Sequence, residues 1–586
     1  MRRIVIGVFA AIGFTVVLLA AAGIAFALLR AVRKPLAERM LLTVDLTRGL
    51  AEGAGENPLA QLLVGKQPTL RDFLDGIEAA ARDPRVKGLY ARVGGDGLGL
   101  AEIQQVRQAI ADFRARGKFA LAYADSFGEF GPGTRPYYLA TAFNKIWLQP
   151  MGTVGLTGLY SEVPFFKGTL DLLGIEPSFD KREEFKTAVN TLTHTKMTPP
   201  QREEVEGILG SIGDQIIAGI AEGRGLSEAQ VRQAIDNGPF FATEARRAGL
   251  VDHLGYDDQA LAYARRRAGP DAERIPLATY LERVGRPYSK GPKIALIYGV
   301  GLIQQRDNPQ LALLGEKVMS ARALDRAFRA AVRDPEVRAI LFRIDSPGGS
   351  VVASESIWRD VVFARKRGKP VIVSMGDVAG SGGYYIAAAA NKIVAEPATL
   401  TASIGVFAGK LVLSGFYKKL GITIDSAQLG RNAGMFSAAE DFSSEGHRRL
   451  AAILDLIYRE FKERVASGRH MPLDKVEEVA KGRVWTGAQA KARGLVDALG
   501  GYRTALRLAK KAAGIPPSAP VTLAVYPKRK SLFEILYDRL SGQRGESGEG
   551  AVALLRALKL LPSLRRLAVL IDDPGVLTMP PIGLPR

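Results

Sequence analysis

Short, mainly apolar runs alternate along this chain with segments in which apolar residues recur every three or four positions. In the second half, residues 340–344 and 371–375 are apolar runs, whereas residues 323–332 and 354–366 have the helical spacing. Such runs are typical of buried strands, and the wider spacing is typical of amphipathic helices. Strand, helix and strand in succession predict a mostly parallel sheet covered by helices. We therefore predict an α/β fold.

The pattern occurs twice. Arg333–Val337 matches Arg82–Val86, a displacement of about 251 positions. Further along, Gly494–Asp497 matches Gly249–Asp252. Matches that keep nearly the same displacement over such a distance indicate a duplicated domain. The copies differ between these matches, which suggests that they divide the labour.

The duplication predicts two large domains with flanking segments. We place the first domain at residues 57–270 and the second at 292–515. The stretch before the first, residues 30–56, is a polar connector with one strand-like segment, Met40–Val44. Residues 516–586 form a tail of uncertain structure. Its Leu- and Arg-rich part could lie on a membrane, bind a partner or dock on its own domain.

An uncharged run near the N-terminus predicts a membrane anchor. Residues 4–29 carry no charge, and at about 1.5 Å per helical residue they exceed a bilayer core of about 30 Å. A cleaved signal has an apolar region of only about 7–15 residues, so we expect residues 1–34 to be retained as a transmembrane helix. Two arginines precede the run and four basic residues follow it by residue 39. That count favours an external N-terminus, although long domains cross regardless of local charge.

Composition narrows the classes of partner. With 47% hydrophobic and 24% charged residues, the chain is typical of a folded protein. A net charge of +20 could indicate nucleic acid, but the aromatic residues that stack on bases do not interleave with the basic ones. We therefore predict no nucleic-acid partner and an anionic membrane surface instead. Cysteine is absent, which excludes disulfides and thiol chemistry.

Two glycine-rich turns follow predicted strands in the second copy. Asp345–Ser350 follows the run at 340–344, and Ala379–Gly383 follows the run at 371–375. The first copy has Gly131–Arg135 in place of the second turn. Glycine permits backbone angles and close approaches that a side chain forbids, so amide N–H groups can point into a cleft.

Ser381, between two glycines, is the candidate nucleophile. If the two turns face each other, the amides near Gly348, Gly349 and Gly382 can hold the oxyanion formed when Ser381 attacks a carbonyl. The alternatives are ordinary tight turns or a phosphate cradle. The Gly-Lys-Ser/Thr signature of a Walker motif is absent, which weakens the second alternative.

A serine nucleophile needs a partner that accepts its proton. None of the four histidines lies near the end of a predicted core strand, and we interpret all of them as surface residues: His194, His253, His447 and His470. A lysine base must then be considered.

The turn sequences resemble those of the signal peptide peptidase A family, also called protease IV. The resemblance rests on Asp345–Ser350, Met375–Tyr385 and Leu400–Gly405. The layout is similar to the long form of that family, with a transmembrane anchor and two tandem ClpP/crotonase-like domains. It implies that Ser381 is the nucleophile and that Lys186, in the other copy, is the general base.

From its neighbours alone, Lys186 reads as a solvated surface lysine, because it follows the charged stretch 181–184. A lysine normally titrates near 10.4, so it can act as a base only if burial lowers its pKa. Ser403 stands where the family has a small hydroxyl residue and would orient the amine, like the third member of a triad. The alternative is a turn serine before Gly405.

The resemblance implies a membrane-anchored serine endopeptidase that degrades signal peptides left in the membrane after their release from preproteins. It further implies a bowl-shaped homotetramer and no cofactor or metal. We expect a single-pass protein of the bacterial inner membrane with its catalytic domains in the periplasm. Two other classes stay open: a crotonase-like acyl-CoA enzyme, since the same fold supports enolate chemistry, and a non-catalytic membrane scaffold.

Overall fold

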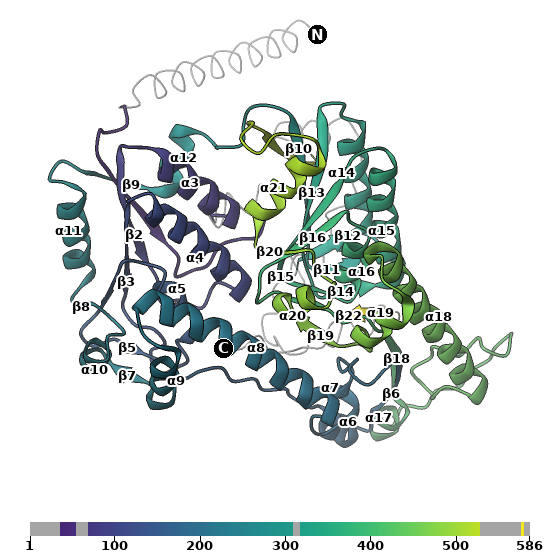
Figure 1. Cartoon of the computed structure of the whole chain (residues 1–586). Helices are drawn as coiled ribbons and strands as arrows, with labels where there is room; N and C mark the ends of the chain where they lie inside the picture. Colours follow the sequence, from purple (N-terminus) through teal and green to yellow (C-terminus); the bar gives the residue numbers. More distant parts are fainter. Residues whose placement is uncertain (1–34, 54–67, 309–316, 528–575, 579–586) are drawn as a thin grey trace, which may run out of the picture.

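The computed structural model of the chain describes residues 35–53, 68–308, 317–527 and 576–578. The predicted anchor at residues 1–34 and the Leu- and Arg-rich part of the tail lie outside these ranges. Within them, every helix is too short or too polar to span a bilayer. Figure 1 shows two α/β units side by side, the first purple to blue and the second teal to green.

The first unit is built on a six-stranded sheet with the order β8-β4-β3-β2-β1-β9, in which every neighbouring pair is parallel. Its strands are β1 Met40–Asp45, β2 Val86–Arg92, β3 Phe119–Ala124, β4 Lys145–Leu148, β8 His253–Leu254 and β9 Glu273–Pro276. Strand β1 lies in the stretch that we assigned to the connector, so the sheet begins before residue 57. Pairing with β2 and β9, which are distant in sequence, gives β1 its place.

Helices cover this sheet and extend from it. They are α3 Leu70–Arg82, α4 Leu100–Ala115, α5 Thr134–Ala140, α6 Lys167–Leu173, α7 Asn190–Thr193, α8 Pro199–Arg224, α9 Glu228–Asn237, α10 Ala242–Arg247, α11 Asp257–Ala268 and α12 Leu277–Val284. The long helix α8 runs from the first unit toward the second (Figure 1). A small pair of strands, β5 Thr153–Val154 and β7 Phe240–Phe241, lies beside them.

The second unit repeats the plan, with the sheet order β19-β17-β15-β13-β10-β21 and with β16 pairing to β15 and β20. Its strands are β10 Lys293–Val300, β13 Val337–Ser346, β15 Val371–Gly380, β16 Lys392–Ala395, β17 Leu400–Ala402, β19 Val484–Thr486, β20 Ala498–Leu499 and β21 Thr522–Tyr526. Strand β21 lies beyond residue 515, so part of the tail forms an edge of this sheet.

Its helices are α14 Ala321–Arg333, α15 Val351–Lys366, α16 Gly382–Ala388, α17 Ser414–Lys419, α18 Ser444–Arg469, α19 Leu473–Val479, α20 Gly487–Ala492 and α21 Tyr502–Ala512. The strands and helices predicted in the second half are therefore confirmed, and so is the α/β class.

Three pairs of corresponding long helices in the two units have equal lengths. Helices α3 and α14 each have 13 residues, α4 and α15 each have 16, and α8 and α18 each have 26. The same kind of cap begins α3 and α14: the Thr69 hydroxyl accepts the N–H of Asp72 at 3.0 Å, and the Ser320 hydroxyl accepts that of Ala323 at 3.3 Å. Caps fix where a helix starts. The two units are thus tandem domains with one plan.

The two domains share a core. One cluster of buried apolar side chains contains Leu89 and Ile103 of the first domain together with Leu341 and Ile372 of the second. Polar contacts cross the same boundary: the carboxylate of Asp377, in β15, accepts the N–H of Ala101, the second residue of α4, at 2.8 Å. The domains are therefore held in one relative position, which matters for any site between them.

Two small sheets complete the fold, and the first of them joins the two domains. Strand β6 Glu176–Lys181 of the first domain pairs antiparallel with β18 Phe407–Val412 of the second. The other sheet has the order β12-β11-β14-β22 and comprises β11 Leu302–Gln304, β12 Val318–Ser320, β14 Gly348–Ser350 and β22 Val576–Thr578. Its strand β14 is the first glycine-rich turn of the sequence analysis.

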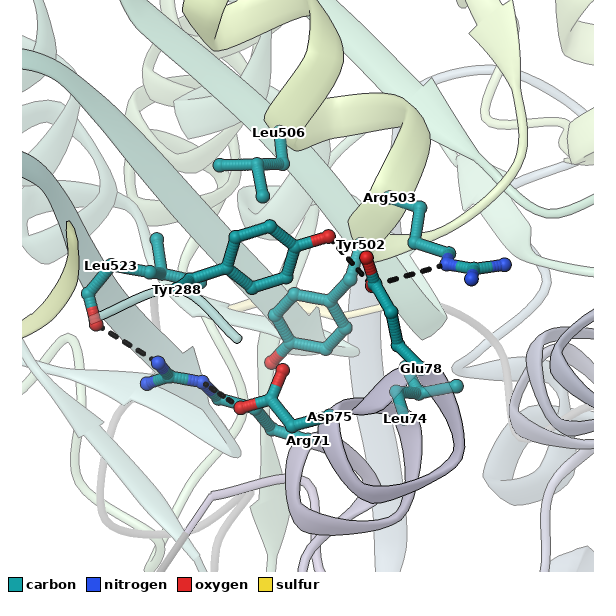
Figure 2. A pocket seen from close by; sticks show the side chains of 9 residues that line it. All are labelled: Arg71, Leu74, Asp75, Glu78, Tyr288, Tyr502, Arg503, Leu506 and Leu523. Carbon is teal, nitrogen blue, oxygen red and sulfur yellow. Dashed lines mark hydrogen bonds and ion pairs between the residues drawn. The ribbon is translucent and has the colours of Figure 1, made fainter. Parts of the chain in front are cut away.

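A small hollow lies elsewhere on the boundary, between α3 and α21. Figure 2 shows its lining, where the Tyr288 hydroxyl donates to Glu78 at 2.6 Å and Arg503 lies 3.5 Å from the same carboxylate. Arg71 donates to the carbonyl of Leu523 at 2.9 Å. The lining includes none of the residues predicted for catalysis, so we regard the hollow as part of the contact between the domains.

Candidate active site

Ser381 stands at a sharp junction between β15 and α16. Its backbone angles are φ 53° and ψ −115°, a conformation that residues with a side chain rarely adopt. The turn is held because the Ser381 N–H donates to the carbonyl of Ala402, in β17, at 2.7 Å. The side chain is fully buried. Strained strand-to-helix turns of this kind are found where a nucleophilic hydroxyl must point away from its own backbone.

Lys186 comes from the first domain and is also fully buried. It lies in an irregular segment between β6 and α7, which reaches into the second domain: the N–H of Phe185 donates to the carbonyl of Lys481 at 3.1 Å. The approach is so close that a Cβ on Gly482, whose φ is +78°, would lie 2.8 Å from the Cα of Lys186. The interpretation of Lys186 as a solvated lysine is therefore wrong, because the other domain covers it.

The lysine amine meets both predicted hydroxyls. Lys186 Nζ lies 2.9 Å from Ser381 Oγ, 3.0 Å from Ser403 Oγ and 3.1 Å from the carbonyl oxygen of Ser403. A neutral amine has two N–H groups and one lone pair. If Ser403 accepts both N–H groups, the lone pair faces the hydroxyl of Ser381. The distance lies within the range of about 2.6–3.2 Å that general-base catalysis needs.

The electrostatics favour the neutral amine near neutral pH. Burial lowers the pKa of Lys186 from 10.5 to about 7, while the carboxyl group of Glu204 acts in the opposite direction. Removing the charged ammonium from water is unfavourable, so the proton is released at a lower pH than in solution. At pH 7 a substantial fraction of the molecules can accept a proton at this nitrogen.

The predicted oxyanion residues lie beside Ser381. Gly348 and Gly349 have φ of 107° and 152°, and a Cβ on Gly382 would lie 3.3 Å from the backbone nitrogen of Gly349. The structure thus brings the backbones of Gly349 and Gly382 together. The amide of Gly382 is at the start of α16, where an N–H has no partner within the helix. The N–H of Gly348 instead donates to Ser346 Oγ at 3.1 Å.

The outer edge of β14 accepts an extended segment. Strand β22 pairs with it antiparallel, with Thr578 opposite Gly348, Leu577 opposite Gly349 and Val576 opposite Ser350. The residue opposite Gly349 therefore lies next to the backbone that could bind an oxyanion. An edge with this pairing can bind a peptide strand.

One residue beside this site, Glu204, was not predicted from the sequence. Glu204, in α8, is 1% exposed and accepts the N–H of Val484, in β19, at 2.6 Å. It follows Glu203 in a run of charged helical residues, and such runs usually face solvent. The histidines, by contrast, interact elsewhere: the ring of His253 stacks on Trp147 at 4.8 Å between centroids.

Comparisons with known proteins identify the family of the chain. The model of Peptidase family S49 matches residues 113–270 and again 363–516. The chain is 32% identical over 499 residues to "Serine protease SPPA, chloroplastic" of Arabidopsis thaliana, which covers 84% of this chain and 72% of that protein. It is 29% identical to "Protease 4" of Salmonella typhi over 84% of this chain and 79% of that protein.

These matches define a serine peptidase with two tandem α/β domains. The chain belongs to Peptidase family S49, in the long form typified by signal peptide peptidase A. The family resemblance seen in the sequence is thereby confirmed.

Proposed function

We propose that the chain is a serine endopeptidase that uses a Ser-Lys dyad, with Ser381 as nucleophile and Lys186 as general base. The observation that carries the proposal is the 2.9 Å contact between a buried amine and a buried hydroxyl from different domains. Ser403 accepts the N–H groups of the amine and so orients its lone pair. No cofactor or metal takes part in the proposed reaction.

The reaction proceeds through an acyl-enzyme. As Ser381 Oγ attacks the scissile carbonyl, its proton moves to Lys186 Nζ, and the amides of Gly349 and Gly382 bind the oxyanion. The ammonium then protonates the departing amine, which leaves an ester on Ser381. Water loses a proton to the same nitrogen, attacks the ester and releases the acid. Lys186 thus returns each proton within the half-reaction that supplied it, the first to the departing amine and the second to Ser381 Oγ, which restores the free serine.

The substrate binds as an extended strand on the edge of β14. The antiparallel pairing of β22 with this edge supports the proposal, because it has the geometry that an added peptide strand would take. Hydrogen bonds to the main chain of the peptide would supply affinity without requiring a particular peptide sequence. Signal peptides left in a membrane are apolar and have few charged side chains, so they suit a site of this kind.

We further propose that residues 1–34 anchor the chain in the bacterial inner membrane by a single span, with the two domains in the periplasm. Tethering would raise the local concentration of peptides that leave the bilayer. The two domains, which β1 and β21 extend beyond the bounds expected from the sequence, would be of the ClpP/crotonase type. The proposed anchor rests on the uncharged N-terminal run and the basic net charge, and the proposed domain type rests on the family resemblance.

We propose a homotetramer formed through two short segments, one at α6 (residues 166–173) and one that follows α17 (residues 420–436). We call these segments the arms. Large apolar side chains are exposed on both arms: Phe166, Leu172, Leu173, Leu420, Ile422, Ile424, Leu429 and Phe436. Exposed apolar patches commonly mark protein contacts. The double variant Leu172→Asp/Leu429→Asp should have a lower mass in light scattering than the parent. An unchanged mass would contradict the proposal that the arms form the contact between subunits.

The test of the catalytic proposal is labelling with a fluorophosphonate, which modifies activated serines. We expect labelling at Ser381, located by peptide mass mapping, and its loss in Ser381→Ala and Lys186→Ala. Lys481→Met is a matched control, because this half-exposed lysine is close in space but its amine faces Glu184 at 3.7 Å.

Two other classes of protein give different results in the same test. A crotonase-like acyl-CoA enzyme would need no reactive serine, so Ser381 would stay unlabelled while acyl-CoA was turned over. A membrane scaffold would show neither labelling nor turnover.

A further inference from the structure

A carboxyl group links the two domains directly behind the dyad. Glu204 lies near the start of α8, in the first domain, and its Oε1 accepts the N–H of Val484 of the second domain at 2.6 Å. Its Oε2 accepts the hydroxyl of Thr187 at 3.4 Å. Thr187 is the residue after Lys186. One buried side chain thus contacts the segment that carries the base and a strand of the opposite domain.

That strand leads to the nucleophile. Strand β19 pairs antiparallel with β17, with Val484 opposite Ala402. The carbonyl of Ala402 accepts the N–H of Ser381 at 2.7 Å. A continuous path therefore runs from Lys186 through Thr187, Glu204 and two strands to Ser381. Any shift of Glu204 relative to Val484 would change the separation of the amine and the hydroxyl.

The charges around Glu204 come from three elements. Lys186 faces it from the segment after β6, Lys181 faces it from β6 itself, and Arg483 faces it from the residue before β19. Arg483 also binds Glu203 at 2.7 Å on the exposed side of α8. Burial raises the pKa of Glu204, and the Glu204 carboxylate in turn raises the pKa of Lys186. The two groups therefore titrate as a coupled pair, in which the charge of each favours the charged form of the other.

We propose that Glu204 is a positioning residue, which holds the segment of Lys186 against β19 and so sets the contact between its amine and Ser381. This inference rests on the proposed Ser-Lys function. Glu204 touches neither the substrate edge of β14 nor the reacting atoms, so it acts through Thr187 and Val484. Its charge, when present, also retains the proton on Lys186.

Three variants separate these effects. Glu204→Gln keeps a carbonyl oxygen for the Val484 N–H and removes the charge. Glu204→Leu removes the acceptor as well. Glu203→Gln is the matched control, since the neighbouring carboxylate also bonds across the domains but is exposed. The readouts are the pH profile of kcat/KM with a fluorogenic peptide, the rate of Ser381 labelling by a fluorophosphonate, and a thermal melt.

We expect Glu204→Gln to move the acid limb of the profile to lower pH by roughly half a unit to one unit, because the carboxylate no longer favours the protonated lysine. Glu204→Leu should lower kcat by about tenfold or more with little change in KM, as expected when positioning and not binding is lost. Glu203→Gln should resemble the parent in both respects.

The inference is overturned if the acid limb of Glu204→Gln coincides with those of the parent and Glu203→Gln. It is also overturned if a folded Glu204→Leu keeps the parent kcat. Should Glu204→Leu not fold, the profile of Glu204→Gln still decides. If labelling of Ser381 in the parent does not depend on Lys186, the proposed function is refuted, and this inference falls with it. The two failures are therefore distinguishable.

Discussion

The side chain of Lys186 is buried, and none of the described residues offers its amine a carboxylate as a bonding partner. This determines how the activity should depend on pH. Burial lowers the pKa of Lys186 to about 7, and only the neutral form can accept the proton of Ser381. We therefore expect kcat/KM to rise through an acid limb with a midpoint near pH 7. A pH series with a neutral fluorogenic peptide measures this, and a midpoint near 10 would mean that the base is solvated.

The same burial should destabilise the folded chain. The pKa of Lys186 is lower folded than unfolded, so between about 7 and 10.5 the unfolded chain binds more protons and the free energy of unfolding rises with pH. Below about pH 7 the penalty is complete. At about 1.36 kcal/mol per pKa unit, the loss in the free energy of unfolding is at most about 5 kcal/mol.

Replacing Lys186 with Met, which has a similar shape, removes this penalty. We expect Lys186→Met to be inactive but more stable than the parent at pH 7, by up to several kcal/mol. The gain should shrink toward pH 10.5. Denaturant unfolding at the two pH values measures it, and a variant less stable than the parent at pH 7 would contradict the burial argument.

Gly482 allows the close contact between its backbone and that of Lys186. A methyl group there would lie 2.8 Å from the Cα of Lys186, so Gly482→Ala should displace the base and lower kcat at least tenfold. Gly514→Ala is the control, because its φ of +67° gives similar backbone strain but a Cβ there meets nothing within 4 Å. If both variants lose activity equally, strain and not displacement is the cause.

At the scale of single residues, the local sequence pattern pointed to one half of the proposed dyad, Ser381. The glycines around Ser381 follow a strand and mark a turn, so their chemistry could be inferred from neighbours. Lys186 has no such context, and only the family resemblance pointed to it. Its function depends on a contact between residues 195 positions apart. The burial of Glu204 could not be predicted from the sequence, because the opposite domain packs over it.

Among the elements, buried strands and amphipathic helices were predictable because their periodicity is local. Which strands pair within each sheet could not be predicted from local periodicity. Strand β1 lies before the predicted start of the first domain and β21 after the predicted end of the second, yet both pair within the sheets. Their places depend on partners far away in the sequence. Short helices such as α6 and α17 carry too few residues for any period to be recognised.

A cap supplied by one domain to a helix of the other gives a prediction at the scale of elements. Asp377 accepts the N–H groups of Ala101 at 2.8 Å and Glu102 at 3.4 Å, at the start of α4. Asp377→Ala should lower the free energy of unfolding by about 1–2 kcal/mol, the usual effect of losing a cap. Asp377→Asn keeps an acceptor and should lose less. Equal losses in denaturant unfolding would argue against the cap.

For the whole molecule, the duplication explains how the site is built. One copy carries the proposed nucleophile, oxyanion glycines and substrate edge, and the other carries the proposed base between β6 and α7. Each copy alone would expose its part of the shared core. The division also means that the site is complete only where the domains meet, which the order of motifs along the chain does not reveal.

The C-terminal strand gives the last prediction. Strand β22 pairs with all three residues of β14, the edge proposed to bind substrate, so a peptide must displace it. We expect a chain that ends at residue 575 to show a lower KM for peptides, by about threefold or more, with kcat unchanged, because a competing ligand raises only the apparent KM. Steady-state kinetics on peptides of increasing length measures the effect, which should be largest for peptides long enough to span β14. Leu577→Pro removes one backbone N–H from the strand and should act in the same direction as the truncation. An unchanged KM in both variants would mean that substrate and β22 do not compete, and that the peptide enters the site along another edge.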